Sequence, residues 1–145
     1  MKKNILLFPL LVMSICAFSQ TFTVVNKSGT DIFFTVNASD KNTCDQKYFS
    51  AGTRSVAGST LTYNTPADIP WSGAAAPQGA EYSDLGAQFI SESGACVSAA
   101  SYHLGNSKCA KKSTATLDIS KCGGSGSDLH LSWEEKNGNI TVTIK

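Results

Sequence analysis

The chain has 145 residues, of which 41% are hydrophobic and only 16% are charged. This length accommodates one domain of ordinary size and excludes two. The formal net charge of +1 excludes a strongly basic nucleic-acid-binding protein and a disordered acidic chain.

The N-terminus has the pattern of a bacterial secretory signal peptide. Two lysines precede an apolar run over residues 5–15, and Ala17 and Ser19 are small residues at the positions that signal peptidase reads. The run is much shorter than the roughly 20 residues that a transmembrane helix needs. We therefore predict a signal peptide over residues 1–19, a single domain over residues 20–145, and a secreted protein, extracellular or periplasmic, without a transmembrane segment.

Cleavage before Gln20 removes Lys2, Lys3 and Cys16. Of the 12 basic residues, 10 then remain against 11 acidic residues, which gives a net charge of −1. Lipid attachment at Cys16 is the alternative, but it requires a small residue before the cysteine, and Ile15 stands there.

Hydrophobic residues alternate with polar ones along most of the remaining chain, which is typical of β-strands. The first half predicts a hairpin over 22–36, a polar loop over 37–47, strands at 48–56 and 60–64, and an irregular stretch over 65–80. Three of the four prolines fall in that last stretch, which argues against a helix there.

The second half predicts further short strands. One is expected at residues 86–92 and another at 114–120, separated by a helical turn or a strand within 97–105. Residues 123–127 are rich in glycine and serine and predict a flexible connection.

The C-terminal hairpin is the strongest structural signal. Asn137-Gly138 is a preferred pair for a two-residue type I′ turn. Counting outward from this turn sets Trp133 opposite Val142 and Leu131 opposite Ile144. Both apolar sets then lie on one face, as burial in a core requires, and Trp133 is predicted to be a core residue.

Seven or eight short strands with glycine-rich turns predict an all-β fold, an antiparallel β-sandwich. Residues 22–26, followed by Ile32 and Phe33, resemble the opening strands of thaumatin-like proteins, and residues 58–61 continue the resemblance. That family's dense cysteine framework is missing, with Ser28 where its first cysteine would fall. The resemblance therefore implies a sandwich and no function.

Four cysteines remain after cleavage, at Cys44, Cys96, Cys109 and Cys122. An even number in an oxidising compartment predicts two disulfides, each worth roughly 2–4 kcal/mol. The pairing stays open among three possibilities, and loop economy favours Cys44–Cys96 with Cys109–Cys122. The absence of a C-x-x-C pair argues against a metal site at these cysteines.

The predicted ligand-binding residues are Trp71 and Tyr82. Trp71 lies outside any alternating pattern, and an aromatic residue on a loop of a rigid scaffold often stacks on a sugar or anchors a partner. The alternative is that Trp71 folds inward and closes one end of the sandwich.

A calcium site is the one metal prediction. Asn37, Asp40, Asn42 and Asp45 bring four side-chain oxygens into a nine-residue stretch, and calcium prefers oxygen ligands. The simpler interpretation is that these residues form turns by bonding their own backbone, in which case the protein has no cofactor.

No arrangement for catalysis is evident. Only His103 and His130 are available as bases, and residues 123–127 lack the spacing of a nucleophile elbow. We therefore predict that the protein is not an enzyme.

The sequence favours a secreted binding module that recognises a carbohydrate or another cell-surface component. A second hypothesis is a membrane-acting β-sandwich, pore-forming or lipid-binding, that uses Lys108, Lys111 and Lys112 for peripheral contact. A third is an inhibitor of a secreted enzyme that presents the loop over 109–122.

Overall fold

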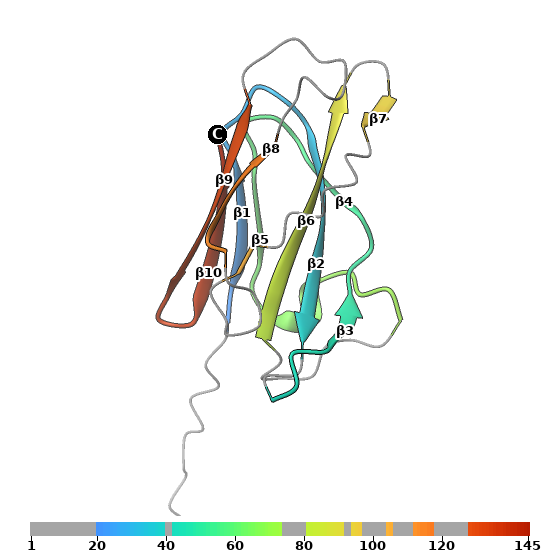
Figure 1. Cartoon of the computed structure of the whole chain (residues 1–145), viewed down its shortest axis with the longest axis vertical. Coiled ribbons are helices and arrows are strands. Elements are labelled where there is room, and N and C mark those ends of the chain that lie inside the picture. The colour runs from blue at the N-terminus through green and yellow to red at the C-terminus, as the bar shows by residue number, and fades with distance from the viewer. Residues whose placement is uncertain are drawn as a thin grey trace, which may run out of the picture.

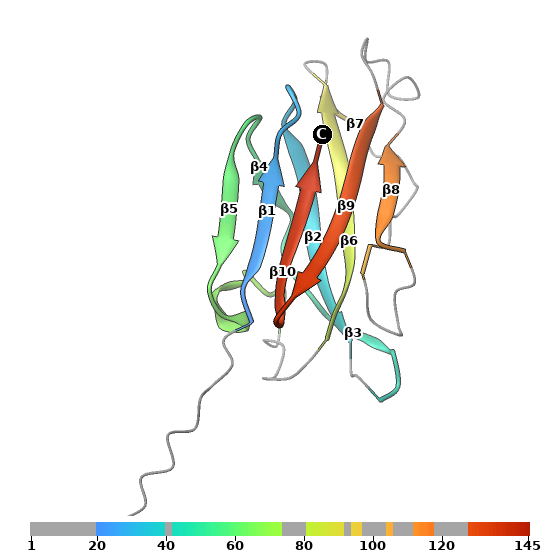
Figure 2. The same ribbon diagram turned by 90° about the vertical axis from the view of Figure 1, so that its left-hand side faces the viewer.

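A computed structural model gives the fold and describes residues 20–39, 42–73, 81–91, 94–96, 104–105, 112–117 and 128–145. The predicted signal peptide, the predicted flexible connection and most of residues 97–105 lie outside these ranges. Within them the chain is mostly β-strand and forms two five-stranded sheets. Figure 1 shows the sheets side by side, and Figure 2 shows the first sheet in front of the second.

The first sheet, sheet A, joins the beginning and the end of the domain. Its strands are, in spatial order, β5 (Thr60–Tyr63), β1 (Phe22–Asn26), β10 (Asn139–Ile144), β9 (Leu129–Lys136) and β8 (Thr114–Leu117). β1 and β10 are parallel, whereas the other neighbours are antiparallel. The expectation of a purely antiparallel fold is therefore wrong at the β1–β10 pair.

The second sheet, sheet B, is antiparallel at every described pair. Its order is β3 (Gln46–Phe49), β2 (Ile32–Ser39), β6 (Glu81–Ser91) and β7 (Gly94–Cys96), and β4 (Thr53–Ser55) pairs with β2 beside β3. The described residues thus form ten strands rather than seven or eight. The predicted strand at 48–56 is divided into β3 and β4, and β7 adds another.

The inward faces of the two sheets share one apolar core. Side chains alternate along each strand, so β1 buries Phe22 and Val24, and β2 buries Ile32 and Phe34. The same cluster contains Val36, Ala38, Tyr63, Ile69, Leu104, Leu129, Leu131, Trp133, Ile140, Val142 and Ile144. Each large side chain buried in this way contributes about 1.5–3 kcal/mol.

The C-terminal hairpin confirms its prediction in register and turn. Trp133 pairs with Val142 and Leu131 with Ile144. Asn137 and Gly138 have φ angles of 53° and 79°, as a type I′ turn requires. The Trp133 ring is 5% exposed and meets the ring of Phe22 edge-on, with centroids 5.5 Å apart. Its predicted place in the core is therefore also confirmed.

The hairpin predicted over residues 22–36 is wrong. β1 pairs with β5 and β10 in sheet A, whereas β2 belongs to sheet B. Alternation identifies the inward face of a strand, and two strands on opposite sides of one core show the same alternation as two paired strands. The pattern therefore could not reveal that the chain crosses from one sheet to the other.

Two further boundaries differ from the sequence expectations. The predicted loop over 37–47 begins later, because β2 continues to Ser39. The strand expected at 86–92 begins at Glu81 and pairs with β2 along most of its length. The irregular stretch that starts at residue 65 contains one short 3₁₀ helix, η1 (Pro66–Asp68).

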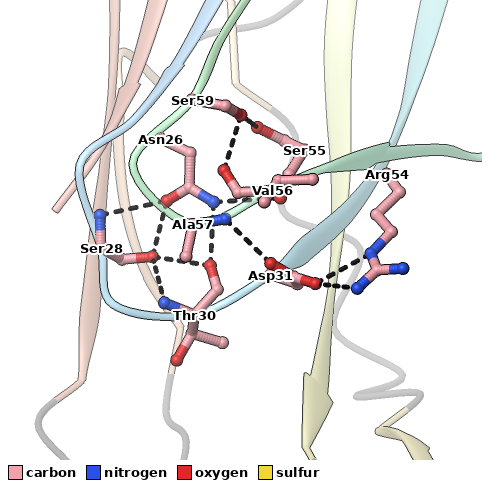
Figure 3. Close-up of polar contacts among 9 residues, drawn as sticks. All are labelled: Asn26, Ser28, Thr30, Asp31, Arg54, Ser55, Val56, Ala57 and Ser59. Carbon is pink, nitrogen blue, oxygen red and sulfur yellow. Dashed lines mark hydrogen bonds and ion pairs between the residues drawn. The ribbon is translucent and has the colours of Figure 1, made fainter.

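A buried asparagine organises the corner where the chain leaves sheet A (Figure 3). The Asn26 side-chain amide donates to the carbonyl oxygens of Thr30, at 2.8 Å, and Ser55, at 3.1 Å. Its Oδ1 accepts hydrogen bonds from the backbone N–H and the hydroxyl of Ser28, at 3.0 and 2.6 Å. Asn26 is 1% exposed, and these bonds compensate for its burial.

The turn at Gly138 allows a direct test of the hairpin geometry. We expect Gly138→Ala to lower the free energy of unfolding by roughly 1–2 kcal/mol, because a Cβ is unfavourable at positive φ. Chemical denaturation measures this change. Gly52→Ala is the matched control, since Gly52 has no positive φ and open space around the added methyl. Equal stability of the two variants would contradict the assigned turn.

Candidate functional site

The segment that carries Trp71 is attached to the end of β3. Ser50 and Trp71 form an antiparallel bridge, and the Ser72 N–H donates to the Phe49 carbonyl oxygen at 2.7 Å. β3, η1 and the start of β6 lie at the same end of the molecule, at the bottom of Figure 1. We call Tyr48, Phe49, Pro70 and Trp71 the aromatic corner.

Trp71 is held by specific contacts on the inner side of this corner. Its indole Nε1–H donates to the carbonyl oxygen of Pro66 at 2.7 Å. Its ring lies edge-to-face with Tyr48, with centroids 6.5 Å apart and planes inclined by 73°. Both rings are partly buried and pack against the core. These contacts match the alternative that Trp71 closes one end of the fold, and its ligand-binding role stays a prediction.

Phe49 is the exposed aromatic residue of the corner. Adjacent residues of a strand point to opposite faces, so Phe49 points away from the side on which Tyr48 packs. Its side chain is 45% exposed. Sequence reasoning missed this residue, although two consecutive aromatic residues in a strand indicate that one of them faces outward.

Tyr82, the other predicted ligand-binding residue, lies near the start of β6. Its backbone pairs with Ala38, which pairs with Tyr48 on its other side. The register therefore brings Tyr82 and Tyr48 into one row across three strands. The register of β2 shifts at this row, both against β3 and against β6. The side chain of Tyr82 lies outside the part of the structure that is described.

The four predicted calcium ligands are not all in one loop. Asn37 belongs to β2, where it pairs with Phe49, while Asn42 and Asp45 are exposed and Asp40 lies outside the described residues. The Oδ1 atom of Asn37 is buried and has no hydrogen-bond partner. Among the described residues, no three acidic, histidine or cysteine side chains form a metal-binding group. The calcium site stays a prediction.

Of the predicted disulfide residues, Cys44 is exposed and has a φ of 59°. The side chain of Cys96 is not among those described, and Cys109 and Cys122 also lie outside the described ranges. The pairing therefore stays a prediction.

The residues weighed for other functions are spread over the molecule. His130 is exposed on β9, and its Nδ1 lies 3.4 Å from the Thr116 hydroxyl. Lys112 is exposed, whereas His103, Lys108 and Lys111 lie outside the described residues, as does most of the loop over 109–122.

A salt bridge beside the buried Asn26 corner is the main electrostatic feature of the described residues. The Arg54 guanidinium pairs with Asp31 Oδ2, and the Ala57 N–H donates to Asp31 Oδ1 at 2.8 Å (Figure 3). The backbone bond from Ala57, followed by the bond from Arg54, lowers the pKa of Asp31 below its ordinary value of 3.8. The pair ties the start of β2 to β4 and to the turn that follows it.

No helix in the part of the chain that the structure describes is long and apolar enough to cross a membrane. In comparisons with known proteins, no family model, curated protein or solved structure matches the chain.

The Asp31 contacts predict a defined pH dependence. Because the folded pKa lies below the unfolded value, the carboxylate stabilises the fold above pH 3.8, and this stabilisation is lost as the pH falls through the folded pKa. Denaturation at several pH values between about 6 and 2 should show a smaller acid-induced loss of stability in Asp31→Asn than in the wild type.

The matched control is Asp128→Asn, at an exposed position immediately before β9. It should follow the wild-type pH profile. If Asp31→Asn and the wild type lose stability in parallel across this range, the assigned role of Asp31 is refuted.

Proposed function

We propose that the protein is a secreted, non-catalytic binding module that recognises neutral carbohydrate through the exposed face of the aromatic corner. The observation that carries this proposal is the 45% exposure of Phe49 on a short strand that is fixed from both sides. Val56 is the other exposed large apolar residue in the described part of the chain.

The scaffold is suited to this role. We infer that the two sheets form a β-sandwich, because residues from both contribute to a single core. A disulfide at Cys44, which we infer, agrees with an oxidising compartment and with the signal peptide inferred over residues 1–19. A stable secreted scaffold allows a small exposed patch to bind without rearrangement.

The described side chains on the segment beside Phe49 are uncharged, which fits a neutral sugar. Pro70 and Ser72 lie on the neighbouring segment, both exposed and both uncharged. Asn37 is the cross-strand neighbour of Phe49 in β2. An apolar ring with a few polar groups around it fits the C–H face and the hydroxyls of a sugar.

We expect the module to be non-catalytic, because no histidine among the described residues lies in the sheet that carries this patch. His130 belongs to sheet A, whereas Phe49 belongs to sheet B. General acid–base chemistry requires the base within hydrogen-bond reach of the reacting group.

Titration of the secreted protein with a panel of neutral oligosaccharides tests the proposal. Calorimetry should give saturable binding, and Phe49→Ala should weaken it about tenfold or more, equivalent to roughly 1.4 kcal/mol. Trp71 fluorescence, followed with and without calcium, reports in parallel on the inner side of the corner and on the predicted calcium site.

Val56→Ala is the matched control, because it truncates the other exposed apolar side chain and lies in the turn between β4 and β5. It should bind as the wild type does. Absence of binding to every sugar in the panel, or equal affinity of Phe49→Ala and wild type, would refute the proposal.

Secretion has its own test. When the full chain is expressed in a bacterium, the exported product should begin at Gln20, as measured by intact mass. Substitution of Ala17 and Ser19 by bulky residues should leave an uncleaved precursor. An exported product that retains residues 1–19 would contradict the inferred signal peptide.

A further inference from the structure

We propose that the outer edge of β5 is a self-association site, at which two copies of the chain pair β5 with β5 and extend sheet A across a two-fold axis. Within the described residues, β5 is the last strand on this side of sheet A, and Figure 2 shows it at the left margin of the sheet. The proposal is independent of the ligand patch, which belongs to sheet B.

The hydrogen-bond pattern shows which groups of β5 point outward. β5 pairs with β1 in the register Val24 to Leu61 and Thr23 to Thr62, and the Asn26 N–H donates to the Ser59 carbonyl oxygen at 2.9 Å. In an antiparallel pair, hydrogen-bonded and non-hydrogen-bonded residue pairs alternate.

Counting in steps of two from Ser59, the backbone groups of Leu61 and Tyr63 point toward β1. The N–H and C=O groups of Thr60 and Thr62 therefore point to the outer edge. The hydrogen bonds of β1 agree with this assignment. The backbone groups of the odd-numbered residues Thr21 and Lys27, at its two ends, form hydrogen bonds with β10.

β5 lacks the features that prevent edge-to-edge pairing. Natural edge strands carry charges, prolines or bulges. In sheet B, β3 includes Lys47 and has a register shift against β2, and β4 includes Arg54. β5 consists of Thr-Leu-Thr-Tyr, with no charge, no proline and no register shift against β1. β8 is the outer strand at the other end of sheet A, and residues 118–127, which follow it, lie outside the described ranges.

The strand is complementary to itself. Opposite residues of an antiparallel pair lie on the same face of the sheet, so a two-fold axis at Thr62 sets Thr62 against its own copy and Leu61 against Tyr63 of the second copy. The Thr62 pair would be hydrogen-bonded through its outward N–H and C=O groups. Apolar side chains meet on the core side, hydroxyls meet on the outer face, and no like charges are brought together.

A row of threonines on the outer face would continue across this junction. Thr62, Thr23 and Thr141 are neighbours in the register of three strands, and the hydroxyls of Thr23 and Thr62 lie 3.3 Å apart. The closed two-fold arrangement ends the exposed edge instead of propagating it, which gives a dimer and not a fibre.

Sedimentation velocity and native mass spectrometry of the exported protein test the proposal over a concentration series. The wild type should show a monomer–dimer equilibrium. Thr62→Pro should raise the dimer dissociation constant at least tenfold, because it removes an outward N–H that β1 does not use. Thr62→Lys should have a similar effect, because it sets two ammonium groups opposite each other.

Thr143→Lys is the matched control, since it makes the same change on the outer face of β10, two strands away from the edge. It should dimerise as the wild type does. If Thr62→Pro does not fold, as judged by circular dichroism, Thr62→Lys decides. A wild type that stays monomeric up to its solubility limit overturns the proposal. So does a dimer that survives the Thr62 variants, or one that is lost in Thr143→Lys instead.

Discussion

The arrangement of the two sheets depends on the hydrogen bonds of the buried Asn26 side chain. One amide group bonds to Thr30 in the connection from β1 to β2 and to Ser55 at the end of β4. The Asn26 backbone N–H also reaches Ser59, immediately before β5. The chain crosses between the sheets in both of these connections, so a single residue fixes both crossings. An apolar side chain at this position would leave several buried polar groups without partners.

The two fixed crossings also determine which strands and side chains each sheet exposes at its surface. β2 becomes the central strand of sheet B, and its end carries β3 and the aromatic corner. β5 follows the second crossing and is an edge strand of sheet A, in which some backbone N–H and C=O groups point outward. The proposed ligand patch and the proposed dimer edge therefore belong to different sheets.

Local signals in the sequence predict local structure well. The Asn137-Gly138 turn fixes the register of the last hairpin because the two strands are adjacent in the chain. The position of Trp133 in the core follows from that register. The hairpin expected over 22–36 fails because the partners of β1 are β5 and β10, at a large sequence separation. The sequence around Asn26 is typical of a turn, and only the structure reveals the buried hydrogen bonds of this side chain.

At the candidate site, the sequence predicts Trp71 as a ligand-binding residue because it lies outside any alternating pattern. In the structure, Trp71 packs inward on Tyr48. The exposed residue is its less conspicuous neighbour Phe49.

The most direct test of this account is the free energy of unfolding of Asn26→Ala, measured by chemical denaturation beside Asn139→Ala. Asn139 is an asparagine of sheet A whose Oδ1 accepts one exposed hydrogen bond, from the Thr21 N–H at 3.2 Å. We predict a loss of at least about 2 kcal/mol for Asn26→Ala, because buried donors and acceptors lose their partners, and a change within about 0.5 kcal/mol for Asn139→Ala. Equal, small effects in both variants would contradict the claim that Asn26 holds the two sheets in their arrangement.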